Sequence, residues 1–251
     1  MIGLVRNEWK KVFLPVLLTT VLLAIAMSVL SCTIYQNYVL HYDLEAWEVG
    51  TELFSLLYPL FVVVPLCWNL YYERKNNFLL YVMPRAKIKK YLTAKWIAYA
   101  LGTLCIIVIP YILSAVFALY VKPPVVPFVE NPFSHIFENA FIKTPLLYAV
   151  ALSLWRGTVS LFVMTFGFIL ALYCKNIFVI LTGPFMYSIL ENFVLAILCL
   201  ERLRLVVAFD PTTVNPEVVS IFSFFFGPIV LSIVIGLTAF LLSKKNAVVT
   251  I

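Results

Sequence analysis

Six stretches of mainly apolar residues dominate this sequence, and each is close to the roughly 20 residues that a helix needs to cross a bilayer. They cover residues 12–32, 52–72, 96–121, 157–173, 177–198 and 221–243. Of the 251 residues, 63% are hydrophobic and 12% are charged. A soluble domain has about 45–50% apolar residues and about 25% charged ones, so a soluble fold could not bury this much apolar surface. The sequence therefore predicts an all-α, polytopic membrane protein that forms a single transmembrane domain over residues 1–251.

A charged residue interrupts the fourth apolar stretch. Residues 146–173 are apolar except for a few polar side chains and Arg156, and a guanidinium in the middle of a bilayer costs at least about 2.5 kcal/mol. A span that begins at Gly157 places Arg156 at the membrane interface. We then expect residues 145–155 to form a helix that lies among the headgroups.

The basic residues predict the orientation, because they gather on the cytoplasmic side of the spans. Thirteen of the 18 Lys and Arg residues fall on one side, whereas ten of the 12 acidic residues fall on or near the other. Both termini and the longest polar loop, residues 73–95, are therefore expected in the cytoplasm. The outer loops are residues 33–51, 122–156 and 199–220. This asymmetry accounts for the net charge of +6 and excludes a nucleic-acid-binding interpretation.

The motifs of an enzyme or a nucleotide-binding protein are absent from the sequence. It contains no H-E-x-x-H, no G-x-S-x-G and no G-x-x-x-x-G-K-[ST]. The five cysteines show no paired spacing, and His135 and Glu138 form only a lone H-x-x-E in an outer loop. We therefore expect no catalytic residue, no metal site and no bound cofactor in this chain. Any work it performs must draw energy from a partner, an ion gradient or the membrane potential.

The loop of residues 73–95 has the pattern of a docking element. Residues 74–83 can form a short helix with Phe78, Leu79 and Val82 on one face. Pro84 ends that helix, and a second basic, amphipathic segment follows. Anionic headgroups account for part of the basic charge, but a short helix with an apolar face fits a groove on a soluble partner.

Four stretches, together with the six spans, resemble the permease subunits of type-2 ATP-binding-cassette (ABC) exporters, especially the half-size forms of Gram-positive bacteria. The opening L-V-R-N-E-W-K-K-V-F, with Glu8 and Lys11, resembles the family's amphipathic N-terminal helix. The turn at Lys175-Asn176 resembles its short hairpin between the fourth and fifth spans. The sixth span ends at Lys244-Lys245 after an outer segment that folds back into the membrane in such permeases.

The fourth stretch is the loop between the second and third spans. It resembles the family pattern of a glutamate, a short helix, a proline-arginine turn and a lysine that opens the next span; the matching residues are Glu73, Pro84, Arg85 and Lys95. It departs from the pattern where Asn76-Asn77-Phe78 replaces the usual Gly-Thr.

The resemblance implies a transport subunit without catalysis of its own. Two permease chains, identical or related, would form the pathway between them, and separate cytoplasmic ATPase subunits would bind ATP and Mg²⁺. Those subunits would contact the N-terminal helix and the short helix of residues 74–83, which is called the coupling helix in this family. The implied docking residues are Glu8, Lys11, Glu73, Arg74, Phe78, Leu79, Val82, Pro84 and Arg85.

A pathway and its cargo are less directly indicated. Glu191 and Asn192 are polar residues within the outer part of the fifth span, and Phe185 and Tyr187 are nearby aromatic residues that could line a cavity. Glu191 could equally reach the headgroups or pair with Arg202 or Arg204. The acidic, aromatic outer loops favour a hydrophobic or amphipathic peptide or antibiotic as cargo. Two alternatives stay open: a non-transporting membrane scaffold or sensor, and an ion-coupled carrier that uses Glu191.

Overall fold

The computed structural model describes residues 1–78, 87–125, 135–216 and 218–245, and all regular structure in these ranges is helical. Six helices are long and apolar enough to span a membrane, so the chain is an all-helical, multi-pass membrane protein. These helices are α1 (Ile2–Thr33), α2 (Glu45–Lys75), α4 (Ile88–Tyr120), α6 (Pro145–Tyr173), α7 (Ile177–Ile197) and α9 (Ile221–Lys245). The short elements are η1 (Ile34–Asn37), α5 (Glu138–Lys143), η2 (Glu201–Leu203), α8 (Leu205–Phe209) and η3 (Pro211–Thr213).

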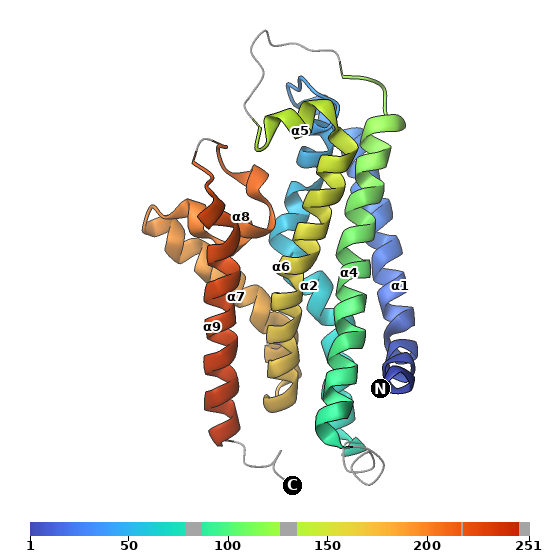
Figure 1. Ribbon diagram of the computed structural model, residues 1–251, viewed down its shortest axis with the longest axis vertical. Helices are drawn as coiled ribbons and strands as arrows, with labels where there is room; N and C mark the ends of the chain where they lie inside the picture. Colours follow the sequence, from blue (N-terminus) through green and yellow to red (C-terminus); the bar gives the residue numbers. More distant parts are fainter. Residues whose placement is uncertain (79–86, 126–134, 217, 246–251) are drawn as a thin grey trace.

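The six long helices form one bundle with α1 and α4 on one flank and α7 and α9 on the other (Figure 1). Helices α2 and α6 lie between these flanks, and each packs against members of both. The start of α1 and the end of α9 lie at the same end of the bundle (Figure 1). We call this the basic end, because it carries most of the Lys and Arg residues, and the other the loop end.

The helices are longer than the apolar stretches that predict them. A bilayer offers the backbone no hydrogen-bond partners, so every spanning segment must satisfy its own N–H and C=O groups. This requirement favours helices that continue beyond the apolar stretch into the polar residues on either side of it. Helix α1 accordingly starts at Ile2, and the expected N-terminal amphipathic helix is the first part of the same helix rather than a separate element. Helix α2 begins at Glu45, within the segment 33–51 that was expected to be a loop.

The predicted break at Arg156 is wrong. Residues 145–173 form one continuous helix, α6, and residues 145–155 do not form a separate helix in the headgroup region. Arg156 is 0% exposed and lies inside the bundle. The cost of burying a guanidinium, which favoured the interface, is offset here because a carboxylate and aromatic rings surround it, as described below.

The segment between α7 and α9 turns back into the bundle at the loop end. All five residues of α8 are buried, and so are Asp210 and Pro211 after it. A tryptophan near the end of a span usually lies at the membrane interface, but Trp47 is 0% exposed within the bundle. Its indole Nε1 donates to the carbonyl oxygen of Tyr111 at 3.0 Å. The core near the loop end is therefore built partly from segments that the hydropathy pattern assigns to outer loops.

Helices α1 and α2 approach each other closely at Gly50. A Cβ atom at this position would lie 2.5 Å from the Cα atom of Ser31, which is backbone and cannot turn aside as a side chain can. Small residues at such contacts allow helix backbones to approach closely in membranes.

Gly50→Leu should therefore force α1 and α2 apart and destabilise the fold by more than about 2 kcal/mol, because overpacking a close contact displaces backbone. The thermal midpoint of the detergent-purified protein measures this effect. Gly3→Leu is the control, because a Cβ atom there meets nothing within 4 Å. Equal midpoints for the two variants would show that the α1–α2 contact is not close.

Candidate functional site

Four charged residues meet at the basic end, where they join three helices. Glu8 and Lys11 come from α1, Glu73 from the last turns of α2 and Lys95 from α4. We call these four residues together with Tyr91 of α4 the ionic cluster. The sequence resemblance places Glu8, Lys11, Glu73 and Lys95 in separate motifs, and the fold brings all four together.

The cluster is a closed network of two carboxylates and two ammonium groups. The Nζ atom of Lys11 lies 2.5 Å from Oε1 of Glu8 and 3.0 Å from Oε1 of Glu73. The Nζ atom of Lys95 lies 3.1 Å from Oε2 of Glu8 and also donates to Oε2 of Glu73. The hydroxyl of Tyr91 donates to the same Glu73 oxygen at 2.9 Å. The charges therefore balance within the network.

Two of the four charged side chains in this network are almost completely buried, so they must stay paired. The side chain of Lys95 is 0% exposed and that of Glu8 is 4% exposed, whereas Lys11 is 36% exposed. A buried ammonium group is strongly destabilising unless it is paired. The pairing ties the beginning of α1, the end of α2 and the first turns of α4 into one unit, so a displacement of any of them must move the others or break an ion pair.

The loop of residues 73–95 starts from this unit. Helix α2 continues through Arg74 and Lys75, so the expectation that Arg74 opens a separate helix is wrong. The guanidinium of Arg74 instead donates to the carbonyl oxygen of Cys174, at the end of α6. Phe78 is 39% exposed, and its ring centroid lies 5.0 Å from Nζ of Lys11. Leu79, Val82, Pro84 and Arg85 lie outside the described residues.

A second charged site lies inside the bundle near the loop end. Nη2 of Arg156 lies 2.7 Å from Oδ1 of Asp210, and both side chains are 0% exposed. The guanidinium carbon lies 4.4 Å from the ring centroid of Tyr111 and 4.7 Å from that of Trp47. Aromatic faces attract a cation and attract it more strongly once it is desolvated. The Arg156–Asp210 pair connects α6 to the chain just after α8.

Helix α8 is fixed at two further points. Both carboxylate oxygens of Glu191 accept the backbone N–H of Leu205 at 3.0 Å, which caps the start of α8. The indole Nε1 of Trp155 donates to the carbonyl oxygen of Ala208 at 2.7 Å. The carboxylate of Glu191 thus binds backbone rather than the side chain of Arg202 or Arg204. Its position is that of a structural cap.

The acidic side chains at the loop end are largely engaged within the chain. Oε1 of Glu45 lies 2.9 Å from Nε2 of His135, and its other oxygen accepts the backbone N–H of His41 at 2.6 Å. Asp43 pairs with Nζ of Lys122 at 2.6 Å. His135 therefore has a defined partner, although it is Glu45 rather than Glu138. These contacts reduce the free negative charge that the outer loops were expected to offer to a cationic cargo.

The four predicted pathway residues lie on α7, which also forms part of a groove in the bundle. A groove of about 710 Å³ lies between α1, α2 and α7, and its wall includes Phe61, Trp68 and Ile177. Asn192 lines a different pocket, beside Arg204. The ring of Tyr187 packs edge-on against Phe166 with centroids 5.8 Å apart, and Phe185 is half-buried. The predicted residues thus lie on α7, but none of them lines the groove.

Sequence reasoning missed the Arg156–Asp210 pair, although a signal for it exists. Arg156 is an isolated charge within a long apolar run, Asp210 follows the short apolar run of residues 205–209, and each would be costly to bury alone. Two isolated charges of opposite sign next to apolar segments are the signal for a buried ion pair. The 53 residues between them gave no local pattern from which the pairing could be recognised.

Searches against protein-family models, curated proteins and solved structures find no match for this chain. The functional argument therefore depends on the geometry of its own residues. Within the described ranges, no group of three or more His, Cys, Asp and Glu side chains is placed to hold a metal ion. The chemistry that the described sites offer is ion pairing and the transmission of force between helices.

Proposed function

We propose that this chain is the membrane-spanning permease subunit of an ATP-driven exporter of the type-2 ABC kind. The observation that carries the proposal is the ionic cluster. It lies where the 73–95 loop leaves α2, and it links that point to α1 and α4 through Glu8 and Lys95. A cytoplasmic partner that moves the loop would therefore move three spanning helices together. ATP and Mg²⁺ would be bound by that partner, and the membrane would be the bacterial plasma membrane.

The groove between α1, α2 and α7 supports the second part of the proposal, a pathway shared with another permease chain. It is open on the lipid-facing side of the bundle, and Trp68 and Tyr72 on its wall are 43% and 42% exposed. Exposed aromatic residues along a groove suit a partner helix or an apolar cargo. A second copy, or a related chain, facing this groove would enclose a cavity for a hydrophobic or amphipathic peptide or antibiotic.

An ion-coupled carrier is a weaker candidate because Glu191, the carboxylate on which it would depend, is occupied in capping α8. A non-transporting scaffold would also bind a partner at the loop, but without transport. Reconstitution with an ATPase encoded next to this chain separates the three. The exporter requires ATP for peptide transport into or out of vesicles, the carrier an ion gradient, and the scaffold gives no transport.

Phe78→Asp tests the docking surface. A carboxylate in place of this exposed ring should reduce the amount of ATPase that co-purifies with the chain by about tenfold, because it replaces an apolar contact surface with a charge that must be desolvated on binding. Tyr38→Asp is the control, because Tyr38 is also exposed but follows η1, beyond the end of α1 that is far from Glu8 and Lys11. Equal recovery of the ATPase with both variants would contradict docking at this loop.

A further inference from the structure

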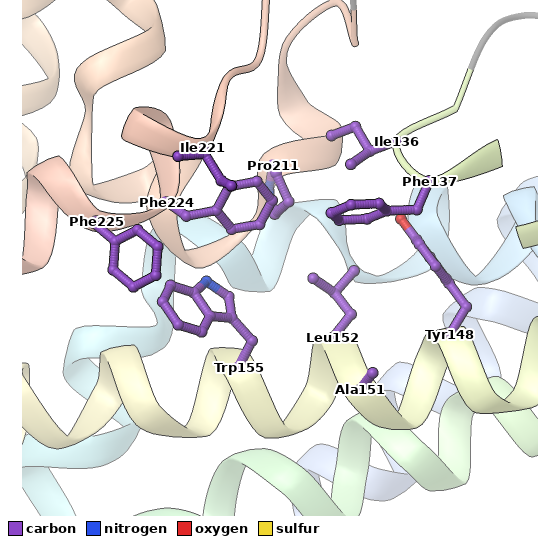
Figure 2. A pocket seen from close by; sticks show the side chains of 10 residues that line it. All are labelled: Ile136, Phe137, Tyr148, Ala151, Leu152, Trp155, Pro211, Ile221, Phe224 and Phe225. Carbon is purple, nitrogen blue, oxygen red and sulfur yellow. The ribbon is translucent and has the colours of Figure 1, made fainter. Parts of the chain in front are cut away.

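An apolar groove runs along the seam between α6 and α9, away from the ionic cluster. Its upper section, toward the loop end, encloses about 360 Å³, and its lower section, toward the basic end, encloses about 240 Å³. Trp155 and Phe225 line both sections, so the two are successive parts of one groove. Figure 2 shows the upper section, where Leu152 and Trp155 of α6 point toward Phe224 and Phe225 of α9, and Tyr148 lies beside Phe137.

The packing of α9 explains why this groove exists. Gly227 lets α9 approach α8 so closely that a Cβ atom there would lie 2.8 Å from the Cα atom of Leu205. Helix α9 therefore packs on α8, and its face beside α6 is left partly exposed. Ile221, Phe225 and Ile229, which line this face, are 73%, 50% and 56% exposed. The groove thus opens toward the surrounding bilayer.

The groove has few polar groups, and three of them already donate hydrogen bonds within the chain. The indole N–H of Trp155 is bound to the carbonyl oxygen of Ala208 at 2.7 Å. The hydroxyl of Thr158 donates to the carbonyl oxygen of Trp155 at 2.6 Å, and that of Ser232 to the carbonyl oxygen of Pro228 at 2.7 Å. A ligand that enters the groove therefore gains mainly dispersion contacts and apolar burial.

The dimensions match a single hydrocarbon chain. From Tyr148 to Phe162 the groove follows α6 for 14 residues, which is about 21 Å at 1.5 Å per residue. One leaflet contributes about 15 Å of the hydrocarbon core. The groove is parallel to the spanning helices, and acyl chains have this direction on average. It is also long enough for one chain at full extension.

We propose that this groove is a binding site for one acyl chain of a membrane phospholipid, held between α6 and α9. The occupant is the lipid rather than a soluble molecule because the groove opens to the bilayer and is lined mainly by apolar side chains. The bound chain fills the seam and holds α9 at its distance from α6. This site is independent of the proposed transport function.

Fluorescence quenching tests the site in the unmodified chain. A phospholipid with brominated acyl chains, added to the delipidated protein in detergent, should quench the emission of Trp155 and saturate near one lipid per chain. Trp155→Phe should remove the saturable component of the quenching. This variant therefore distinguishes the emission of Trp155 from that of the other four tryptophans. Quenching that rises without saturation would overturn the proposal, because it would show ordinary contact with lipid around the protein.

Filling the groove tests the location. Ala151→Phe and Ser232→Phe enlarge side chains in its upper and lower sections. Each should lower the fraction of chains that retain a phospholipid by about tenfold, as measured by native mass spectrometry. Excluding about two CH₂ groups of the acyl chain from the groove weakens binding by this factor. Gly236→Phe is the control, on α9 where a Cβ atom meets nothing within 4 Å. Equal retention in all three variants would overturn the site.

Discussion

Asp210→Asn should lower the free energy of unfolding by about 3–5 kcal/mol, the cost of leaving a buried charge without its partner. Asparagine has nearly the shape of aspartate, so the variant removes the charge and little else. It keeps an oxygen that can accept the hydroxyl of Thr212, which now lies 2.7 Å from Oδ1. The guanidinium of Arg156 would remain 0% exposed with no anion beside it. Reversible unfolding in mixed micelles measures the change.

Glu201→Gln is the matched control. It neutralises the acid of another Arg–carboxylate pair, in which Oε1 of Glu201 lies 3.0 Å from Arg204, but Glu201 is 57% exposed. Exposed pairs contribute little, so the loss should be below about 1 kcal/mol. Arg156→Met combined with Asp210→Leu should recover most of the stability, because neither charge is then left unpaired. A double variant as unstable as Asp210→Asn would show that packing, rather than charge, stabilises α8.

The dependence of Arg156 on a distant partner also explains which features could be predicted from the sequence. The spans are readable because each depends on about 20 consecutive residues, and hydropathy averages over such a window. All six apolar stretches fall within the six long helices except for single residues at two ends. Arg156 was misplaced because its burial depends on Asp210, a residue far along the chain. The cost of a charge in a membrane is local in sequence, but the partner that offsets it is not.

The ionic cluster was predictable to a different degree. Its charged members were recognised from separate motifs that resemble those of ABC permeases, although no sequence pattern showed that they contact one another. Trp47 departs from the local tendency for the same reason as Arg156. An interfacial position is the usual one for a tryptophan near the end of a span, but Trp47 is drawn into the core by its contacts with Tyr111 and Arg156. Tertiary contacts override the local tendency in both places.

Lys95→Met should destabilise the basic end and disconnect the three helices that meet there. The substitution keeps most of the side-chain length but leaves two carboxylates, Glu8 and Glu73, with only the half-buried Lys11 to pair with them. Breaking a buried ion pair by removing one partner costs about 3–5 kcal/mol. The free energy of unfolding in mixed micelles should fall by this amount. In the reconstituted complex, ATP hydrolysis should continue while peptide transport is lost, because the loop would no longer move α1 and α4 together.

Two comparisons determine whether charge balance is the cause. Lys90→Met removes a lysine from an exposed position on the same helix, so it should change stability by no more than about 0.5 kcal/mol. Glu8→Gln combined with Lys95→Met leaves one carboxylate and one ammonium group, Glu73 and Lys11, which are 3.0 Å apart. The double variant should therefore be more stable than Lys95→Met alone, a coupling of about 0.5–3 kcal/mol between contacting residues. If the losses of the two single variants simply add, the four charges do not act as one network, and the route by which the loop moves α1 and α4 is not this cluster.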